Sequence, residues 1–153
     1  MDAEFRELYQ EIILEHSKSP RNFRRMDNAT HKLEGRNPLC GDQFTVYLKI
    51  ENGIIADISF EGSGCAISKA SASVMTSVLK GKSITEAKKL FEQFHNIVTG
   101  VRNAGDCPDV SGKIAAFSGV AEYPVRIKCA TLAWHAMRNS IEGVTNSIST
   151  EEK

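Results

Sequence analysis

A cysteine and an aspartate stand two residues apart in the segment "NPLCGDQF", where Pro38 and Gly41 indicate a turn ahead of a strand-like stretch. A structural cysteine would lie among apolar neighbours, and a disulfide cysteine has no use for Asp42. A thiolate and a carboxylate this close are typical of two ligands of one metal ion. Cys40 and Asp42 are therefore candidate ligands, and the alternative is that Asp42 only hydrogen-bonds backbone amides of the turn.

Two further cysteines belong to expected helices, Cys65 at a helix start and Cys129 in the second turn of the last helix. Cys65 follows Gly-Ser-Gly, and the unpaired amides of a helix N-terminus favour an anion, so Cys65 should be ready as a thiolate. Arg126 lies three residues before Cys129 on the same helix face, and Lys128 adjoins it. Both cations should favour the Cys129 thiolate and could receive an anionic partner group. The alternative for Cys65 is a small residue needed for close packing, and for Cys129 it is burial as an apolar side chain. The alternative for Arg126 and Lys128 is that they form a solvated helix start.

Three thiolates and one carboxylate would suit tetrahedral Zn²⁺, with the aspartate giving a weaker, exchangeable bond. Cys107, in "GDCPD", is expected to be an exposed or half-buried thiol with no further role. The chain has no Cys-x-x-Cys spacing, which argues against a disulfide oxidoreductase and against a purely structural zinc knuckle. Surface or capping positions, rather than metal binding, are expected for the histidines, His16, His31, His95 and His135.

The elements that must position these residues follow from local patterns. Alternating apolar residues predict strands over 43–51 and 54–61, joined by Asn52-Gly53 in a tight hairpin that brings Cys40 and Cys65 near each other. Cys129 could join them only by tertiary packing, which spacing cannot show. A weaker strand is expected over 29–33. Helices are expected over 5–19, 65–81, 83–100, 114–117 and from Pro124 to about 143, with a capping box at Ser83 and Glu86.

Helix, hairpin and then several helices predict an α+β fold in which helices cover one face of a small antiparallel sheet. We expect a single domain over residues 1–143 and a flexible tail over 144–153. The chain has 153 residues, 41% hydrophobic content and a formal net charge of zero, so no overall basic field favours nucleic acid. No apolar stretch approaches the ~20 residues that span a bilayer, and no secretion signal is seen. A cytoplasmic protein with reduced thiols is the expectation.

Three motifs, "NPLCGD", "EGSGCAIS" and "RIKCATLAWHA", together resemble the family of iron–sulfur cluster assembly proteins that includes the IscU scaffolds, most closely its SufU branch. The resemblance extends from the N-terminal helix to about Gly143. It implies an IscU-like α+β sandwich in which Cys40, Asp42, Cys65 and Cys129 come together at one exposed end and bind zinc. Two features resemble SufU: Lys128 stands where scaffold members carry a histidine, and an additional helical segment separates the second cysteine from the third.

The resemblance implies a zinc-dependent sulfurtransferase that accepts persulfide sulfur from a SufS-type cysteine desulfurase and passes it to a downstream scaffold or apo-protein. Cys40 would be the accepting thiolate. Arg126 would steer docking or hold the anionic sulfur. One alternative is an IscU-like scaffold on which a transient Fe–S cluster is built. A second is a zinc-stabilised interaction module without thiol chemistry. Neither nucleic acid nor a membrane is an expected partner.

Overall fold

The computed structural model describes residues 3–102 and 112–150, and Cys107 lies outside them. The architecture is α+β, as predicted. In chain order the elements are α1 (Ala3–Lys18), β1 (His31–Asn37), β2 (Asp42–Glu51), β3 (Ile54–Ser63), α2 (Ala66–Leu79), α3 (Ile84–Val98), α4 (Gly112–Ala115), the 3₁₀ helix η2 (Ser118–Glu122), α5 (Pro124–Ile141) and β4 (Ile148–Ser149).

The sheet is mixed, with strand order β3-β2-β1-β4. The predicted hairpin of β2 and β3 is confirmed, and its turn residues Asn52 and Gly53 have φ of 53° and 74°. The weak strand predicted over 29–33 is instead β1, which begins later and runs on to Asn37, because its antiparallel ladder with β2 continues to the pair Asn37–Asp42. β4 pairs with β1 in parallel and was not predicted.

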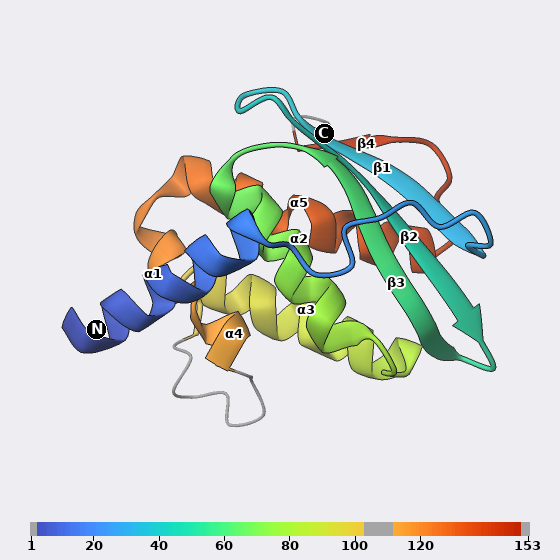
Figure 1. Ribbon diagram of the computed structural model, residues 1–153, viewed down its shortest axis with the longest axis horizontal. Coiled ribbons are helices and arrows are strands. Elements are labelled where there is room, and N and C mark those ends of the chain that lie inside the picture. Colours follow the sequence, from blue (N-terminus) through green and yellow to red (C-terminus); the bar gives the residue numbers. More distant parts are fainter. Residues whose placement is uncertain (1–2, 103–111, 151–153) are drawn as a thin grey trace.

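Helices cover one face of the sheet (Figure 1), with α5 against β1 and β2 and with α2 against β3. α1 packs on α2 and α3 packs on α5, so these two helices form an outer layer. The core therefore lies between the sheet and α2 and α5. Trp134 of α5 is fully buried among the helices, where it stacks on Phe94 of α3 with 4.4 Å between ring centroids. The partly apolar stripe of α5 predicts that only one side of this helix is buried. More of it is buried, because small residues such as Ala130 and Ala133 allow close packing on several sides.

Local signals account for the ends of two helices. Ser83 caps α3, and the predicted capping box with Glu86 is present, with N···O distances of 3.1 and 3.2 Å. Pro124 is the first residue of α5, as predicted. The surface or capping position expected for His16 is wrong: this side chain is 2% exposed and its Nδ1 lies 2.7 Å from the Ser73 hydroxyl of α2.

The single domain over residues 1–143 and the flexible tail over 144–153 stay predictions, and β4 lies within that tail. Within residues 3–102 and 112–150, no helix combines the length and apolar character that crossing a membrane requires.

Candidate metal centre

The loop between β1 and β2 holds two candidate ligands in different settings. Asn37 and Asp42 are the last pair of the antiparallel ladder, and both side chains are buried, at 0% and 2% exposure. Between them the chain turns through Gly41 at a φ of +71°, and the Cys40 amide donates to the Asn37 carbonyl over 3.2 Å. Cys40 is half-buried on the loop, whose Leu39 is exposed. Asp42 is therefore held by the sheet, while Cys40 is carried by a loop.

The junction of β3 and α2 approaches Asp42 closely because it is built from glycines. A Cβ on Gly62, whose φ is +133°, would lie 2.1 Å from the Gln43 carbonyl oxygen. A Cβ on Gly64 would lie 2.6 Å from Asp42 Oδ1. With no Cβ in the way, the Cys65 amide donates to Asp42 Oδ1 over 2.8 Å. The carboxylate thus lies at the N-terminus of α2, where unpaired amides and the helix dipole stabilise negative charge.

Cys65 is the N-cap of α2, and its sulfur accepts a hydrogen bond from the Ser68 amide over 3.5 Å. Ser68 is buried, and its hydroxyl lies 2.5 Å from Asp42 Oδ2 and 3.1 Å from the Cys129 carbonyl oxygen. One side chain thus connects three of the four predicted ligand residues.

Cys129 reaches the site from α5, the segment that spacing could not place. Its side chain is 1% exposed, and its sulfur lies 3.3 Å from the Cys40 sulfur and 3.5 Å from Asn37 Nδ2. Cys40, Asp42 and Cys129 can place one ligand atom each within 4.8 Å of one another. Cys65 is outside that group, although it contacts Asp42 through its backbone amide. Three of the four predicted ligands converge, and Cys65 borders them.

The electrostatics of Cys129 differ from the sequence-based expectation. Burial raises the pKa of the Cys129 thiol, and the hydrogen bond with Cys40 and the nearby Cys65 and Asp42 raise it further. Arg126 and Lys128 were expected to favour this thiolate, but in the chain without metal the burial and the acidic neighbours of Cys129 act against it. The cluster concentrates acidic groups in a buried place, and a cation placed among them would reverse this effect.

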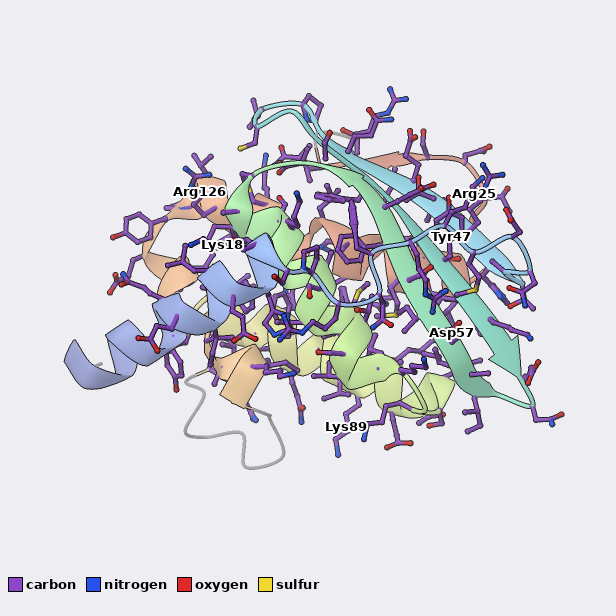
Figure 2. All side chains as sticks on the ribbon, in the orientation of Figure 1. Lys18, Arg25, Tyr47, Asp57, Lys89 and Arg126 are labelled. Atoms are coloured by element: carbon purple, nitrogen blue, oxygen red, sulfur yellow. The ribbon has the colours of Figure 1, made fainter. Side chains whose placement is uncertain are left out.

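Arg126 is the cation that faces the sulfurs. Its side chain is exposed at the start of α5, at the end of the molecule away from Tyr47 and Asp57 of the sheet (Figure 2). Negative charge on the nearby sulfurs raises the pKa of its guanidinium, most through Cys65, then through Cys129, to which it hydrogen-bonds. Arg126 is thus placed to attract an anion to the sulfur cluster.

A groove of about 640 Å³ adjoins the site between α1, the start of α2, η2 and the start of α5. Cys65 and Arg126 lie on its lining, and the exposed Tyr123 lies beside them. The rest of the lining is largely apolar, including Tyr9, Ile13, Ile67, Ala116 and Val120. A partner that reaches Cys65 and Arg126 can therefore also cover apolar surface.

Sequence reasoning missed the residues that support the candidate ligands. Asn37 opens the "NPLCGD" motif and pairs opposite Asp42 in the β1–β2 ladder. A prediction of the register of this hairpin would have placed the two residues together. Ser68 is three residues after an N-cap, the position whose amide faces the capping side chain. Both residues take part in hydrogen bonds to the buried Asp42.

Comparisons with known proteins agree with this architecture. The chain is 40% identical over 134 residues to the zinc-dependent sulfurtransferase SufU of Bacillus subtilis, covering 88% of this chain and 89% of that protein. It is 38% identical over 140 residues to the iron–sulfur cluster assembly scaffold protein IscU of Streptococcus pyogenes, covering 92% and 86%.

A solved structure from Fervidobacterium islandicum AW-1, described as an iron–sulfur cluster assembly scaffold protein for the SUF system, matches with a TM-score of 0.80. The two chains are 35% identical, and the match covers 88% of this chain and 97% of the other. The predicted IscU-like fold and the resemblance to SufU and IscU are confirmed by these relatives. The model of the NifU-like N terminal domain matches residues 8–141. This chain therefore belongs to the NifU-like N-terminal domain family of iron–sulfur cluster assembly proteins.

Proposed function

We propose that this protein is a zinc-dependent sulfurtransferase in which Cys40 accepts persulfide sulfur from a cysteine desulfurase and passes it to a scaffold or apo-protein. The observation that carries the proposal is the contrast between a loop-borne, half-buried Cys40 and the buried Asp42 and Cys129 beside it. The relative named a zinc-dependent sulfurtransferase supports it.

The donor set fits zinc. Two thiols and a carboxylate lie within 4.8 Å of one another, and Cys65 borders them as a third thiol. Zinc takes such ligands in tetrahedral geometry, with Cys65 as the fourth ligand in this proposal. When bound, zinc would supply the positive charge that keeps these thiols ionised. Cys40, Asp42, Cys65 and Cys129 are the residues that would hold it.

Hydrogen bonding makes Cys40 the sulfur that can leave. The Cys129 sulfur accepts a hydrogen bond from the side-chain amide of Asn37, and the Cys65 sulfur accepts one from the backbone amide of Ser68. Within the described part of the chain, the Cys40 sulfur accepts a hydrogen bond from the Cys129 thiol over 3.3 Å. Donors to a sulfur lower its nucleophilicity and hold it in place, and a thiol is a weaker donor than an amide. Cys40, which accepts only from a thiol among the described hydrogen bonds, is therefore the least restrained and the most reactive of the three.

The transfer is a thiol exchange. The Cys40 thiolate attacks the outer sulfur of the partner's persulfide, a new S–S bond forms on Cys40, the partner's S–S bond breaks, and the partner's cysteine leaves as a thiolate. No oxidant is consumed. Arg126 faces the place where the anionic persulfide must arrive, which supports a role in steering it.

The second candidate is a scaffold on which an Fe–S cluster is built, and the IscU-named relatives favour it. Lys128, where scaffold members carry a histidine, favours the first candidate. Anaerobic incubation with iron and sulfide, followed by transfer to an apo-ferredoxin, distinguishes them. A cluster that forms and is transferred would favour the scaffold.

The direct test follows ³⁵S from labelled cysteine through a SufS-type desulfurase onto this protein, separated on non-reducing gels. Cys40→Ala should accept no label and should not stimulate desulfurase turnover. Cys107→Ala is the matched control, because it removes the cysteine outside the proposed set, and it should accept label like the unchanged protein. Labelling of Cys40→Ala at the normal level would contradict the proposal.

A further inference from the structure

The C-terminal strand contacts the candidate metal centre through one side chain. β4 pairs with β1 through Gly35–Ile148 and Arg36–Ser149, and the Thr150 amide then donates to the Arg36 carbonyl over 2.9 Å. The Thr150 hydroxyl lies 3.1 Å from Asn37 Oδ1. A residue near the end of the chain is thus hydrogen-bonded to the residue that opens the metal-site loop.

Asn37 in turn contacts two candidate ligands. It is fully buried, and its Nδ2 lies 3.3 Å from Asp42 Oδ2 and 3.5 Å from Cys129 Sγ. The two ends of its amide therefore have different partners. The carbonyl end accepts from Thr150, and the amino end donates toward the two acidic groups.

We propose that Thr150 and Asn37 are positioning residues for the metal centre, and that docking of β4 sets how tightly the centre holds its ion. The inference rests on the proposed zinc binding by Cys40, Asp42, Cys65 and Cys129. It assigns a role to a segment that lies outside the residues matched by the family model, which end at 141.

The physical reason is the cost of a buried polar atom without a partner. Within the described part of the chain, Thr150 is the donor that the structure gives to Asn37 Oδ1. Without that hydroxyl, a fully buried carbonyl oxygen loses its hydrogen bond, and the amide is free to rotate toward another donor. Rotation would turn its N–H groups away from Asp42 and Cys129 or bring its oxygen toward them, which repels negative charge. Outer-shell partners of metal ligands typically change metal affinity about 10- to 100-fold when removed.

The coupling must also run in the opposite direction. β4 is two residues long and lies at the edge of the sheet, so it should open more easily than the β1–β2 ladder. If docking of β4 strengthens zinc binding by a given factor, zinc must strengthen docking of β4 by the same factor. A merely structural role of Thr150 predicts no such reciprocity.

The test compares zinc affinity, by competition with a chromophoric chelator, in three variants of the full chain. Thr150→Val keeps the shape and the backbone pairing but removes the hydroxyl, and it should weaken zinc binding roughly 3- to 10-fold, somewhat less than a direct partner of a ligand would. Thr150→Ser keeps the hydroxyl and should restore the affinity. Thr45→Val, at another half-buried threonine on β2, is the matched control and should leave the affinity unchanged.

The second readout is amide hydrogen exchange at Thr150, whose N–H is bonded to Arg36. Zinc should slow it several-fold in the unchanged protein and less in Thr150→Val. Equal zinc affinity in Thr150→Val and the unchanged protein would overturn the inference while leaving the proposed function intact. Absence of zinc binding in the unchanged protein would overturn both.

Discussion

The sulfur of Cys129 lies 3.3 Å from the sulfur of Cys40, although the two residues are 89 positions apart in the chain. The first is fixed in a buried helix and the second is carried by a loop. A pair of this kind suits a site in which one sulfur anchors a metal and the other is released.

This asymmetry predicts different consequences of removing each sulfur. Cys129→Ala should weaken zinc binding at least about tenfold more than Cys40→Ala, because the buried residue is held by packing while the loop residue is, in the proposed function, the ligand that exchanges. Chelator competition on both variants measures the difference. Equal losses would contradict the view that Cys40 is the releasable ligand.

The close approach of the junction after β3 to Asp42 predicts that a side chain at Gly64 destabilises the fold and the site. In Gly64→Ala the added Cβ would lie 2.6 Å from Asp42 Oδ1 and 2.8 Å from the Phe44 ring, so one of them must move. We expect a loss of about 1–3 kcal/mol in the free energy of unfolding and a loss of zinc affinity.

Urea denaturation and zinc competition measure these two effects. Gly112→Ala is the matched control, because a Cβ at Gly112 meets nothing within 4 Å. If Gly64→Ala folds and binds zinc like the unchanged protein, the close approach described at this junction is not required.

Removal of zinc should leave the fold intact. A core that buries Trp134, Phe44, Phe60 and Phe94 should not depend on the four proposed ligands at one end of the molecule. After chelation the far-UV circular dichroism at 25 °C should persist, while the thermal midpoint falls. Loss of the circular dichroism signal would instead support the zinc-stabilised interaction module, in which metal binding supplies the folding energy.

The elements of this fold are predictable where their signals are local. Asn52-Gly53 determines the hairpin, Ser83 and Glu86 cap α3, and Pro124 begins α5, each within a few residues of sequence. Their types and approximate bounds therefore follow from turn chemistry, capping and periodicity.

The metal centre is predictable only in part, because it depends on contacts between distant segments. Hairpin geometry brings Cys40 near Cys65, but Cys129 reaches them through packing of α5 on the sheet, and the resemblance to a known family supplied that step. Thr150 has no sequence signal at all, since a two-residue strand carries no periodicity. The burial of His16 is not predictable from local sequence, because its contact with Ser73 depends on how α1 lies across α2.

That buried histidine predicts an acid-sensitive contact between α1 and α2. Burial lowers the pKa of His16, and the positive charges of Arg21 and Lys113 lower it further while Glu15 raises it. The unfolded chain therefore takes up a proton near the ordinary value of about 6.5, and the folded chain does so only at lower pH. Stability from this group is present above pH 6.5 and is lost as the pH falls below it.

As the pH falls, the contribution of His16 to the free energy of unfolding should decrease by no more than about 1.4 kcal/mol per pH unit. Burial also lowers the pKa of His135, so both His16 and His135 should contribute to the pH dependence of stability in the unchanged protein. Urea denaturation at pH 7.5 and 5.5 should show a smaller difference for His16→Gln than for the unchanged protein. His31→Gln, at the start of β1, is the control and should keep the full difference. An equal pH dependence in His16→Gln would refute the assignment.

The exposed cation beside the sulfurs predicts a selective defect in sulfur transfer. Arg126→Ala should raise the KM for a persulfide-loaded desulfurase roughly tenfold, because one attractive charge at the entrance is lost, while zinc content stays normal. Arg126→Lys keeps the charge and should recover most of the loss.

Arg25→Ala is the matched control, since Arg25 is an exposed arginine on the sheet side of the molecule (Figure 2), paired with Asp27. The defect should shrink as salt is raised, because screening removes the same attraction from the unchanged protein. If Arg126→Ala loses its zinc, or if its defect is independent of salt, Arg126 acts by holding the site together rather than by steering the incoming sulfur.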